Sequence, residues 1–280
     1  MRTLGFVTLY HPDAALTASN LRTYLPWVDR LVVWDNTPGA NDNRRCIDAL
    51  LADEAAKLIW VENGQNLGIA RGLNYALRRV LDGDFDLLLM MDQDSNWPDC
   101  GSFMQDVARL HSTDATIGAF TPNVSGLERQ TTDIAEKDFF ITSGTVITRE
   151  AIRGIAPVDE TFAIDALDNE CSIAIREKGF RIVCLTRHVL NHHIGNRKYS
   201  KIFHIGTPDY NAARTYGMCR NHIILIRKRK KSLPLRKKIY FIKEYIIYKL
   251  IRILLVEGDK GHRLRMLIKG IRDGLTYKIR

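Results

Sequence analysis

Two carboxylates one residue apart, Asp92 and Asp94, directly follow an apolar run at residues 87–91. Such a run predicts a buried strand, and ligands of open α/β sheets bind outside the carboxyl ends of the strands. Carboxylates placed there can hold a hard cation, since Mg²⁺ typically binds through one or two carboxylates together with substrate phosphates. The pair therefore indicates chemistry on a nucleotide diphosphate. The alternative is an acidic turn, because Asp and Ser are common turn residues.

Polar residues also follow the other strands expected in the first half of the chain. Strands are expected at residues 4–10, 30–34, 58–61 and 85–91, and helices at residues 14–24, 44–57 and 70–81. This alternation predicts a mostly parallel sheet with helices on both faces. The expected strands end at His11, at Asp35 and Asn36, at Glu62 and Asn63, and at the Asp92/Asp94 pair. Parallel strands end at one edge of a sheet, so these side chains predict a nucleotide site at the strand tips.

The second half of the sequence is less regular. A strand pair or a bent strand is expected over residues 139–148, around Ser143 and Gly144. A helix is expected over residues 165–178, with Gly179 as its C-terminal stop, and a strand over residues 180–185.

Composition limits the class of protein. A chain of 280 residues is long enough for one large α/β domain with a tail, or for two small domains. The five cysteines form no CxxC pair and leave an odd one, which argues against a disulfide framework or a zinc site and fits a reducing compartment. The first twelve residues are expected to contain a strand rather than a signal peptide. No uncharged apolar stretch reaches about 18 residues, so no membrane-spanning helix is expected.

The net charge of +9 is concentrated in the last fifth of the chain. Residues 227–280 hold 18 Lys and Arg against four Asp and Glu, a net charge of +14, whereas the preceding part holds 23 basic and 28 acidic residues, a net charge of −5. Such asymmetry indicates an anionic partner, either a membrane or a nucleic acid. No nucleic-acid-binding motif is recognised, so nucleic acid is not an expected partner.

The tail has the pattern of an amphipathic helix. At about 100° per residue, one side of that helix would gather Lys237, Lys238, Glu244, Lys249 and Arg252, with Ile, Tyr and Leu on the remainder. A basic amphipathic helix with clustered aromatic residues predicts a helix that lies in an anionic membrane interface. The alternative is a helix packed on the rest of the protein with a solvated charged face.

Several short motifs occur in a fixed order along the chain. They are residues 7–10 (VTLY), 33–36 (VWDN), 65–70 (QNLGIA) with Asn74, 91–95 (MDQDS), 141–144 (ITSG), 162–165 (FAID) with Asp168 and Glu170, then His192, Gly195, Arg214, Tyr216, Arg220 and Asn221. In this order they resemble the motifs of family 2 glycosyltransferases, which have the GT-A fold, and within that family those of bacterial rhamnosyltransferases. The resemblance covers about residues 4–225. It implies a glycosyltransferase domain at residues 1–225, followed by a basic helical membrane-associating region at residues 226–280.

The resemblance implies how the protein would hold a nucleotide-sugar donor. Asp94 would bind a divalent metal, Mn²⁺ or Mg²⁺, and Asp92 would lie near the ribose. His192 would complete the metal or diphosphate site, with a buried or capping histidine as the alternative. The implied donor-binding residues are Tyr10, Asp35, Asn66, Gly68, Arg71, Asp92, Arg214 and Arg220.

Each of these donor-binding roles has a structural alternative. Asp35 would contact a pyrimidine base, or would only form the turn that ends its strand. Asn66 and Gly68 precede an expected helix, whose backbone N–H groups favour an anion, but Asn66 can equally cap that helix. Arg71 would pair with a phosphate, or would be an ordinary exposed helix arginine. The two later arginines would grip the diphosphate or cap the last helix of the domain.

The resemblance also implies a general base. An inverting transferase needs one carboxylate that takes the proton of the acceptor hydroxyl as this oxygen attacks the anomeric carbon. The family places this base at the start of a helix, after the segment that here covers residues 162–168, so Asp168 is the expected base, Asp165 the second choice and Glu170 a helper. The alternative is that Asp165 is an N-cap and that the other two acids only favour the positive end of the helix. Ala163 and Ala166 stand where the family often has aromatic residues, so the acceptor contacts are expected to differ.

The implied activity is transfer of a sugar from a nucleotide diphosphate to a hydroxyl of a surface glycan or a lipid-linked glycan. The favoured sugar is L-rhamnose, transferred from dTDP-rhamnose. The protein is expected to be peripheral, at the cytoplasmic face of the membrane. One alternative is a transferase that uses another UDP or dTDP sugar. A nucleotidyltransferase is a second, but residues 8–16 lack its Gly-rich start. A non-catalytic membrane- or polyanion-binding protein is a third, against which the acids Asp92, Asp94 and Asp168 argue.

Overall fold

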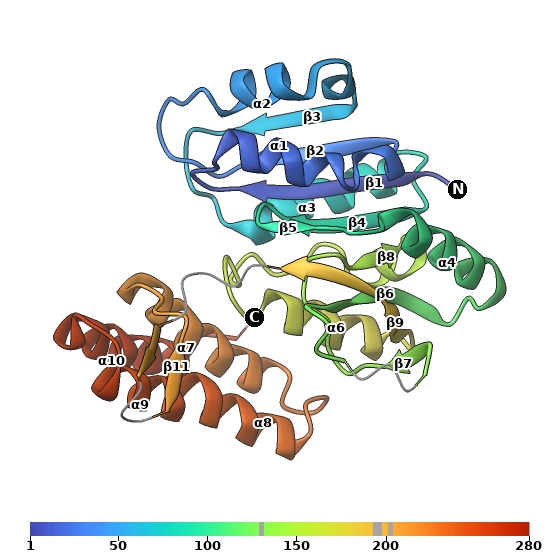
Figure 1. Ribbon diagram of the computed structural model, residues 1–280. Coiled ribbons are helices and arrows are strands. Elements are labelled where there is room, and N and C mark those ends of the chain that lie inside the picture. Colours follow the sequence, from blue (N-terminus) through green and yellow to red (C-terminus); the bar gives the residue numbers. More distant parts are fainter. Residues whose placement is uncertain (129–131, 193–197, 201–203, 280) are drawn as a thin grey trace. The chain divides into compact units, whose positions relative to one another are not determined.

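A computed structural model of the protein describes residues 1–128, 132–192, 198–200 and 204–279 (Figure 1). The chain divides into two compact units. The first, here called the sheet unit, comprises Met1–Ala163 and Ala174–His193. The second, the helical unit, comprises Ile164–Ile173 and Ile194–Arg280.

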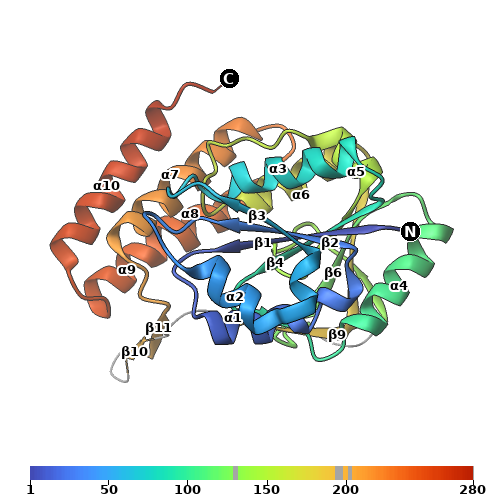
Figure 2. The ribbon, with the colours of Figure 1, turned by 90° about the horizontal axis from the view of Figure 1, so that it is seen from above.

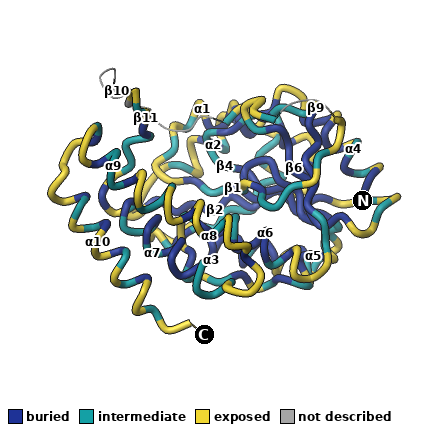
Figure 3. The backbone as a smooth tube through the Cα atoms, turned by 90° about the horizontal axis from the view of Figure 1, so that it is seen from below, coloured by how far each residue is buried: buried dark blue, intermediate teal, exposed yellow. Residues whose placement is uncertain are grey.

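Four parallel strands form one half of the large sheet, in the spatial order β3-β2-β1-β4. They are β1 (Thr3–Leu9), β2 (Arg30–Asp35), β3 (Leu58–Glu62) and β4 (Leu87–Asp92). Strands β1 and β4 are buried along nearly their whole length, as expected for parallel strands covered on both faces (Figure 3). The chain runs outward from β1 to β3 and then returns to the other side of β1, so the topological switch point lies between β1 and β4.

Helices cover both faces of this half of the sheet. Figure 2 shows α1 (Ala14–Arg22) and α2 (Asn43–Leu51) on one face of the strands and α3 (Ile69–Asp82) on the other. The helix predicted over residues 44–57 ends early, at Leu51, and continues as a 3₁₀ segment, Ala52–Lys57. The predicted βαβαβαβ order is confirmed.

The other half of the sheet is mixed. Its strands are β5 (Ser95–Asn96), β6 (Ile117–Val124), β7 (Ile134–Glu136), β8 (Val146–Thr148) and β9 (Arg181–His192). Strand β8 pairs antiparallel with β4 and with β6, whereas β6 and β9 are parallel. Helices α4 (Cys100–Thr113) and α5 (Arg149–Ile155) belong to this half. The predicted α/β fold with a central sheet flanked by helices is confirmed, and its parallel character is confined to the first four strands and the β6–β9 pair.

The strand predicted over residues 139–148 is wrong for most of its length, because only Val146–Thr148 forms a strand. The preceding residues turn at Gly144, which has a φ of +78°. The Gly144 N–H donates to the Met90 carbonyl at 2.8 Å, and the Met90 N–H donates to the Thr145 carbonyl at 2.9 Å. The backbone thus bonds to β4 through a turn instead of a second strand.

The helical unit contains the end of the chain. Its elements are α7 (Ala212–Lys228), α8 (Leu235–Ile242), a π-helical turn (Lys243–Ile247), α9 (Tyr248–Leu255), α10 (Lys260–Thr276), and the short strands β10 (Lys198–Ser200) and β11 (Ile205–Thr207). Helix α10 packs closely on α7 through two glycines: a Cβ at Gly270 would lie 2.7 Å from the Tyr216 carbonyl oxygen, and one at Gly274 would lie 2.9 Å from Cβ of Ile223. The predicted domain boundary between residues 225 and 226 falls inside α7, so the tail shares its packing with the helix before it.

The charged face predicted for the tail helix is wrong at Lys249. Its side chain is only 3% exposed and bonds to Glu257 at 2.8 Å. The physical reason is that Lys249 lies eight residues after Phe241 and four before Ile253, both of which are buried, so it shares the packed face of the tail. Among the described residues, no helix is both long enough and apolar enough to cross a membrane.

Candidate functional site

The tips of β1 and β4 meet at the topological switch point of the sheet unit. The side chain of Gln93, the middle residue of the D-Q-D motif, bridges them. Its Oε1 accepts from the Tyr10 N–H at 2.8 Å, and its Nε2 donates to the Tyr10 carbonyl at 3.2 Å. The Gln93 carbonyl also accepts from Asn20 Nδ2 at 2.8 Å. These bonds fix the loop that carries both carboxylates against the end of β1, as predicted for residues at the strand tips.

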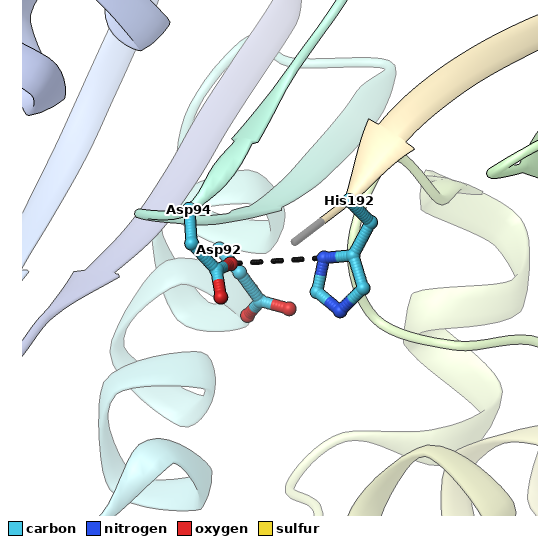
Figure 4. Close-up of side chains that lie close together, drawn as sticks. All are labelled: Asp92, Asp94 and His192. Carbon is cyan, nitrogen blue, oxygen red and sulfur yellow. Dashed lines mark ion pairs between the residues drawn. The ribbon is translucent and has the colours of Figure 1, made fainter. Parts of the chain in front are cut away.

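Asp92, Asp94 and His192 come together at this edge (Figure 4). Asp92 ends β4, Asp94 follows two residues later, and His192 ends β9. Each residue offers one ligand atom, and these atoms all lie within 4.8 Å of one another. His192 Nδ1 lies 3.6 Å from Asp94 Oδ1. Residues that are about one hundred positions apart in sequence therefore form one cluster.

The chemistry of this cluster fits a divalent cation. Carboxylate oxygens suit Mg²⁺ and Mn²⁺, and neutral imidazole is a common metal ligand. Asp94 Oδ1 is buried and has no hydrogen-bond partner among the described residues, so this acceptor is available to a cation. Two carboxylates and one imidazole leave further coordination positions to phosphate oxygens and water, as Mg²⁺ normally requires.

Two serine hydroxyls connect Asp92 with His192 through hydrogen bonds. Ser95 Oγ lies 2.6 Å from His192 Nδ1, and Ser143 Oγ donates to Ser95 Oγ at 2.7 Å. The Asp92 N–H donates to Ser143 Oγ at 3.3 Å. We did not predict a role for either hydroxyl, although Ser95 belongs to the D-Q-D-S motif and Ser143 to the I-T-S-G motif.

Asp35, at the tip of β2, has both carboxylate oxygens bonded inside its own loop. Oδ1 accepts from the Thr37 N–H at 2.9 Å, and Oδ2 accepts from Asn43 Nδ2 at 2.9 Å. Thr37 Oγ1 in turn accepts from the His11 N–H at 3.0 Å, which joins the β2 tip to the β1 tip. The turn considered as the alternative for Asp35 is thus present, and its contact with a base stays a prediction.

The loop before α3 uses its N–H groups internally. The Leu67 N–H donates to Asn36 Oδ1 at 2.8 Å, the Gly68 N–H to Asn66 Oδ1 at 3.1 Å, and the Ile69 N–H to the Ala163 carbonyl at 2.8 Å. The predicted anion site therefore finds these three N–H groups occupied by protein oxygens. Donor contacts by Asn66 and Gly68 stay a prediction.

Two long polar side chains of α3 are paired with the segment around residue 160. Arg71 Nε lies 3.2 Å from Glu160 Oε2, and both side chains are largely exposed. Asn74, part of the QNLGIA motif region, is buried; its Nδ2 donates to the Val158 carbonyl at 2.9 Å, and its Oδ1 accepts from the Val158 N–H at 2.8 Å. Asn74 therefore holds a loop in place, and a phosphate contact by Arg71 stays a prediction.

The two candidate bases lie in the helical unit, at the start of α6 (Leu167–Glu177). Asp165 and Ala166 both have positive φ, +57° and +63°, so the alternative in which Asp165 caps a regular helix start is not what forms. Asp165 Oδ1 lies 3.3 Å from Arg214 Nη2, and Oδ2 is buried. Burial raises the pKa of Asp165, and the Arg214 guanidinium opposes that rise.

Asp168 and Glu170 differ from Asp165 in their surroundings. Asp168 is half-buried, and its Oδ1 accepts from the Asn169 N–H at 2.8 Å. Glu170 is buried and bonded by both oxygens to Arg229, at 2.9 and 2.6 Å, with Lys228 at 2.9 Å from Oε1. Glu170 thus anchors the end of α7 to α6, and the helper role considered for it stays a prediction.

The arginines of the last motif take part in packing of the helical unit. The Arg214 guanidinium lies 3.8 Å from the centroid of the Tyr210 ring. Arg220 Nη1 donates to Asn221 Oδ1 at 2.9 Å, and Tyr216 Oη donates to Asp273 Oδ2 at 3.1 Å. Donor binding by Arg214 and Arg220 stays a prediction, and Gly195 lies outside the described residues.

Comparison with known proteins supports the resemblance seen in the sequence. No protein-family model matches the chain. The chain is similar to the dTDP-rhamnosyl transferase RfbF of Shigella flexneri, at 24% identity over 244 residues, which cover 80% of this chain and 79% of that protein. Its fold is similar to that of GalNAc-T7 in a crystal structure with UDP, GalNAc and Mn²⁺, with a TM-score of 0.59, 11% identity and 87% of this chain covered. This chain spans 55% of that chain. The predicted resemblance to glycosyltransferases of family 2 with the GT-A fold is confirmed.

Proposed function

We propose that this chain, which has the GT-A glycosyltransferase fold and is similar over most of its length to a dTDP-rhamnosyl transferase, is an inverting transferase of L-rhamnose from dTDP-rhamnose to a glycan hydroxyl. The observation that carries the proposal is the convergence of Asp92, Asp94 and His192 at the topological switch point of the sheet. Ligands of such sheets bind in the crevice at that point. The cluster offers donor atoms for a cation, and a diphosphate is the ligand that Mg²⁺ or Mn²⁺ commonly accompanies.

The cluster of Asp92, Asp94 and His192 at the strand tips would bind the nucleotide-sugar donor. Asp94 and His192 would hold Mn²⁺ or Mg²⁺, with Asp92 near the ribose of the nucleotide. When bound, such a metal supplies Lewis-acid stabilisation of the charge on the departing diphosphate. The Gln93 side chain bonds to the backbone of Tyr10, a proposed donor-binding residue. It therefore holds the two carboxylates in place next to Tyr10.

Asp168 would act as the general base for the acceptor. Inversion in a single displacement requires that one carboxylate takes the proton of the acceptor hydroxyl as its oxygen attacks the anomeric carbon. Both residues are half-buried, but Asp165 faces Arg214 through Oδ1 and its Oδ2 is buried, whereas Asp168 lies in the first turn of α6, where the family resemblance places the base. This contrast supports Asp168 over Asp165.

Donor binding by the purified protein tests the proposal. The purified chain would be titrated with dTDP-rhamnose, UDP-glucose and UDP-N-acetylglucosamine, each with Mn²⁺ and with EDTA. We expect dTDP-rhamnose to bind in the presence of Mn²⁺, and binding to be lost with EDTA and in Asp94→Asn. Preference for a UDP sugar would replace the proposed donor, and a folded protein that binds none of the three would contradict the transferase assignment.

We also propose that the helical unit binds an anionic bilayer on the cytoplasmic side, where a lipid-linked glycan would be the acceptor. Apolar side chains on α8 are exposed to solvent: Leu235 is 70% exposed, Ile239 49% and Ile242 41%. Arg236 and Lys243, which lie among them, are also exposed. Exposed apolar residues with flanking cations are typical of helices that lie in a membrane interface, and residues 227–280 carry a net charge of +14. Each Lys or Arg near an anionic surface contributes about 1 kcal/mol.

Co-sedimentation with vesicles tests this second proposal. We expect binding to vesicles that contain phosphatidylglycerol and little binding to pure phosphatidylcholine, with the difference reduced by salt. The double variant Leu235→Ser/Ile239→Ser should lose binding. Leu127→Ser, which alters an exposed leucine of the sheet unit, is the control and should bind as wild type does. Equal binding by all three proteins would contradict the proposal.

A further inference from the structure

Two buried serines, Ser95 and Ser143, stand between the Asp92 backbone and the His192 ring. Both residues are fully buried. The hydrogen-bond chain runs from the Asp92 N–H to Ser143 Oγ at 3.3 Å, from Ser143 Oγ to Ser95 Oγ at 2.7 Å, and from Ser95 Oγ to His192 Nδ1 at 2.6 Å. The bond to the ring is the shortest of the three. These two residues are called the serine pair below.

Backbone pairing places both hydroxyls. Strands β5 and β9 are antiparallel, with Ser95 directly opposite His192, so the two side chains lie on the same face of the ladder. Ser143 precedes Gly144, whose N–H donates to the Met90 carbonyl of β4. A Cβ at Gly144 would lie 2.7 Å from Cγ of Pro122, so glycine permits the close approach that presents Ser143. The serine pair is therefore held by three different strands.

We propose that the serine pair positions His192 for cation binding and couples the orientation of its ring to the main chain of Asp92. This inference rests on the proposed function, since it requires His192 to be a metal ligand. A metal-ligating histidine usually has a second hydrogen bond from its ring, which fixes the ring orientation and the tautomer, and loss of that outer partner typically lowers metal affinity by about 10- to 100-fold. Ser95 Oγ can accept a hydrogen bond from Nδ1–H, and this tautomer leaves the lone pair of Nε2 for the cation.

The serine pair also links two residues of the cluster that come from distant parts of the chain. Asp92 belongs to β4 and His192 to β9, which are not neighbours in the sheet. Ser143 bonds to the first and Ser95 to the second, so two hydroxyls connect the ends of these strands. The pair thus ties the main chain of Asp92 to the ring of His192.

The Mn²⁺ affinity of the whole 280-residue chain without donor, measured as free Mn²⁺ by electron paramagnetic resonance, tests the proposal. We expect Ser95→Ala to weaken Mn²⁺ binding by about 10- to 100-fold. Ser143→Ala should act in the same direction but less, because it contacts the ring only through Ser95. Thermal unfolding of each variant in EDTA establishes that the fold is retained.

Ser125→Ala is the matched control. Ser125 Oγ donates to the main-chain oxygen of His192 at 3.3 Å, so it touches the same residue without touching the ring. Its removal should leave Mn²⁺ affinity within about twofold of wild type. A loss as large as that of Ser95→Ala would show that any hydroxyl near β9 has the same effect and would overturn the proposal.

A double-mutant cycle separates positioning from general packing. If Ser95 acts through His192, then Ser95→Ala in the His192→Ala background should cause no further loss of Mn²⁺ affinity. The same loss in both backgrounds would overturn the proposal. If wild type binds Mn²⁺ and Ser95→Ala binds it equally well, the proposed function stands and the role of the serine pair fails. If folded wild type binds no Mn²⁺, the metal site itself fails.

Discussion

Asp168 and Asp165 are three residues apart, but their surroundings differ. Mutation of each residue can therefore show which one is the general base. We expect Asp168→Asn to lower kcat by about 10²- to 10⁴-fold, the usual contribution of a general base, while donor and Mn²⁺ affinity stay at wild-type values. Rates of sugar transfer at saturating donor measure this. Asp165→Asn is the comparison, because Asp165 bonds to Arg214 and has one buried oxygen. A larger kcat loss in Asp165→Asn than in Asp168→Asn would reverse the assignment.

His222 gives the helical unit a pH-dependent stability. It is fully buried, donates from Nδ1 to the Met218 carbonyl at 2.8 Å, and stacks on Tyr245 with ring centroids 3.4 Å apart. Burial lowers the pKa of His222 to about 4, below its ordinary value of 6.5. Protonation therefore favours the unfolded chain, so the contribution of His222 is complete above pH 6.5 and is lost as the pH falls towards 4.

Urea unfolding at several pH values measures this effect. Between pH 7 and pH 5, the free energy of unfolding of wild type should fall by about 2 kcal/mol more than that of His222→Phe, which retains a ring but does not titrate. Parallel pH profiles for the two proteins would contradict the prediction.

At the scale of elements, the start of α3 depends on Gly68. This residue has φ +82° and ψ 159°, a backbone region that is essentially restricted to glycine. A Cβ at Gly68 would also lie 2.7 Å from Cβ of Ala163 and 3.1 Å from its carbonyl oxygen. We expect Gly68→Ala to lower the free energy of unfolding by about 3 kcal/mol, from backbone strain and overpacking together.

Gly126→Ala is the control for Gly68→Ala. Gly126 also has a positive φ, +66°, but a Cβ there would meet nothing within 4 Å. Only the strain of the left-handed backbone applies to Gly126→Ala, so its free energy of unfolding should fall by about 1 kcal/mol. Equal losses in the two variants, measured by urea unfolding, would mean that the contact with Ala163 contributes nothing to the cost.

At the scale of the whole molecule, a buried ionic network makes the tail part of the helical unit. Glu257 is fully buried and bonds to Lys249, to Thr207 Oγ1 at 2.6 Å, and to Arg263 Nη1 at 2.8 Å. These partners come from α9, β11 and α10. The bonds to these cations and to Thr207 lower the pKa of Glu257 although burial opposes it.

We expect Glu257→Gln to lower the free energy of unfolding by about 3 kcal/mol, because it leaves a buried lysine and arginine without their shared counter-charge. Glu244→Gln is the control: its partner Arg252 lies at 2.8 Å, but both side chains are about one quarter exposed, so the expected loss is within about 1 kcal/mol. Both values come from urea unfolding at neutral pH. If Glu257→Gln costs no more than the control, the network does not stabilise the tail.

The order of the first seven elements, the fold class and the position of the carboxylate pair could be predicted from the sequence. These follow from local signals: apolar runs define buried strands, periodicity defines helices, and polar residues at strand ends mark one edge of a parallel sheet. The cluster of Asp92, Asp94 and His192 was also predictable, because the family resemblance aligned a late histidine with the two acids. Local sequence patterns were sufficient for features that depend on a single strand or helix.

Which polar residues are committed to internal bonds could be seen only in the folded protein. The roles of Gln93 and of the serine pair, and the anchoring of Glu170 by Arg229, depend on contacts between residues far apart in the chain, which no local pattern encodes. The same holds for Lys249: a helical wheel placed it on the charged face, but packing within the helical unit buries it against Glu257. Side-chain partners are set by packing between elements, so they become visible only when the elements are assembled.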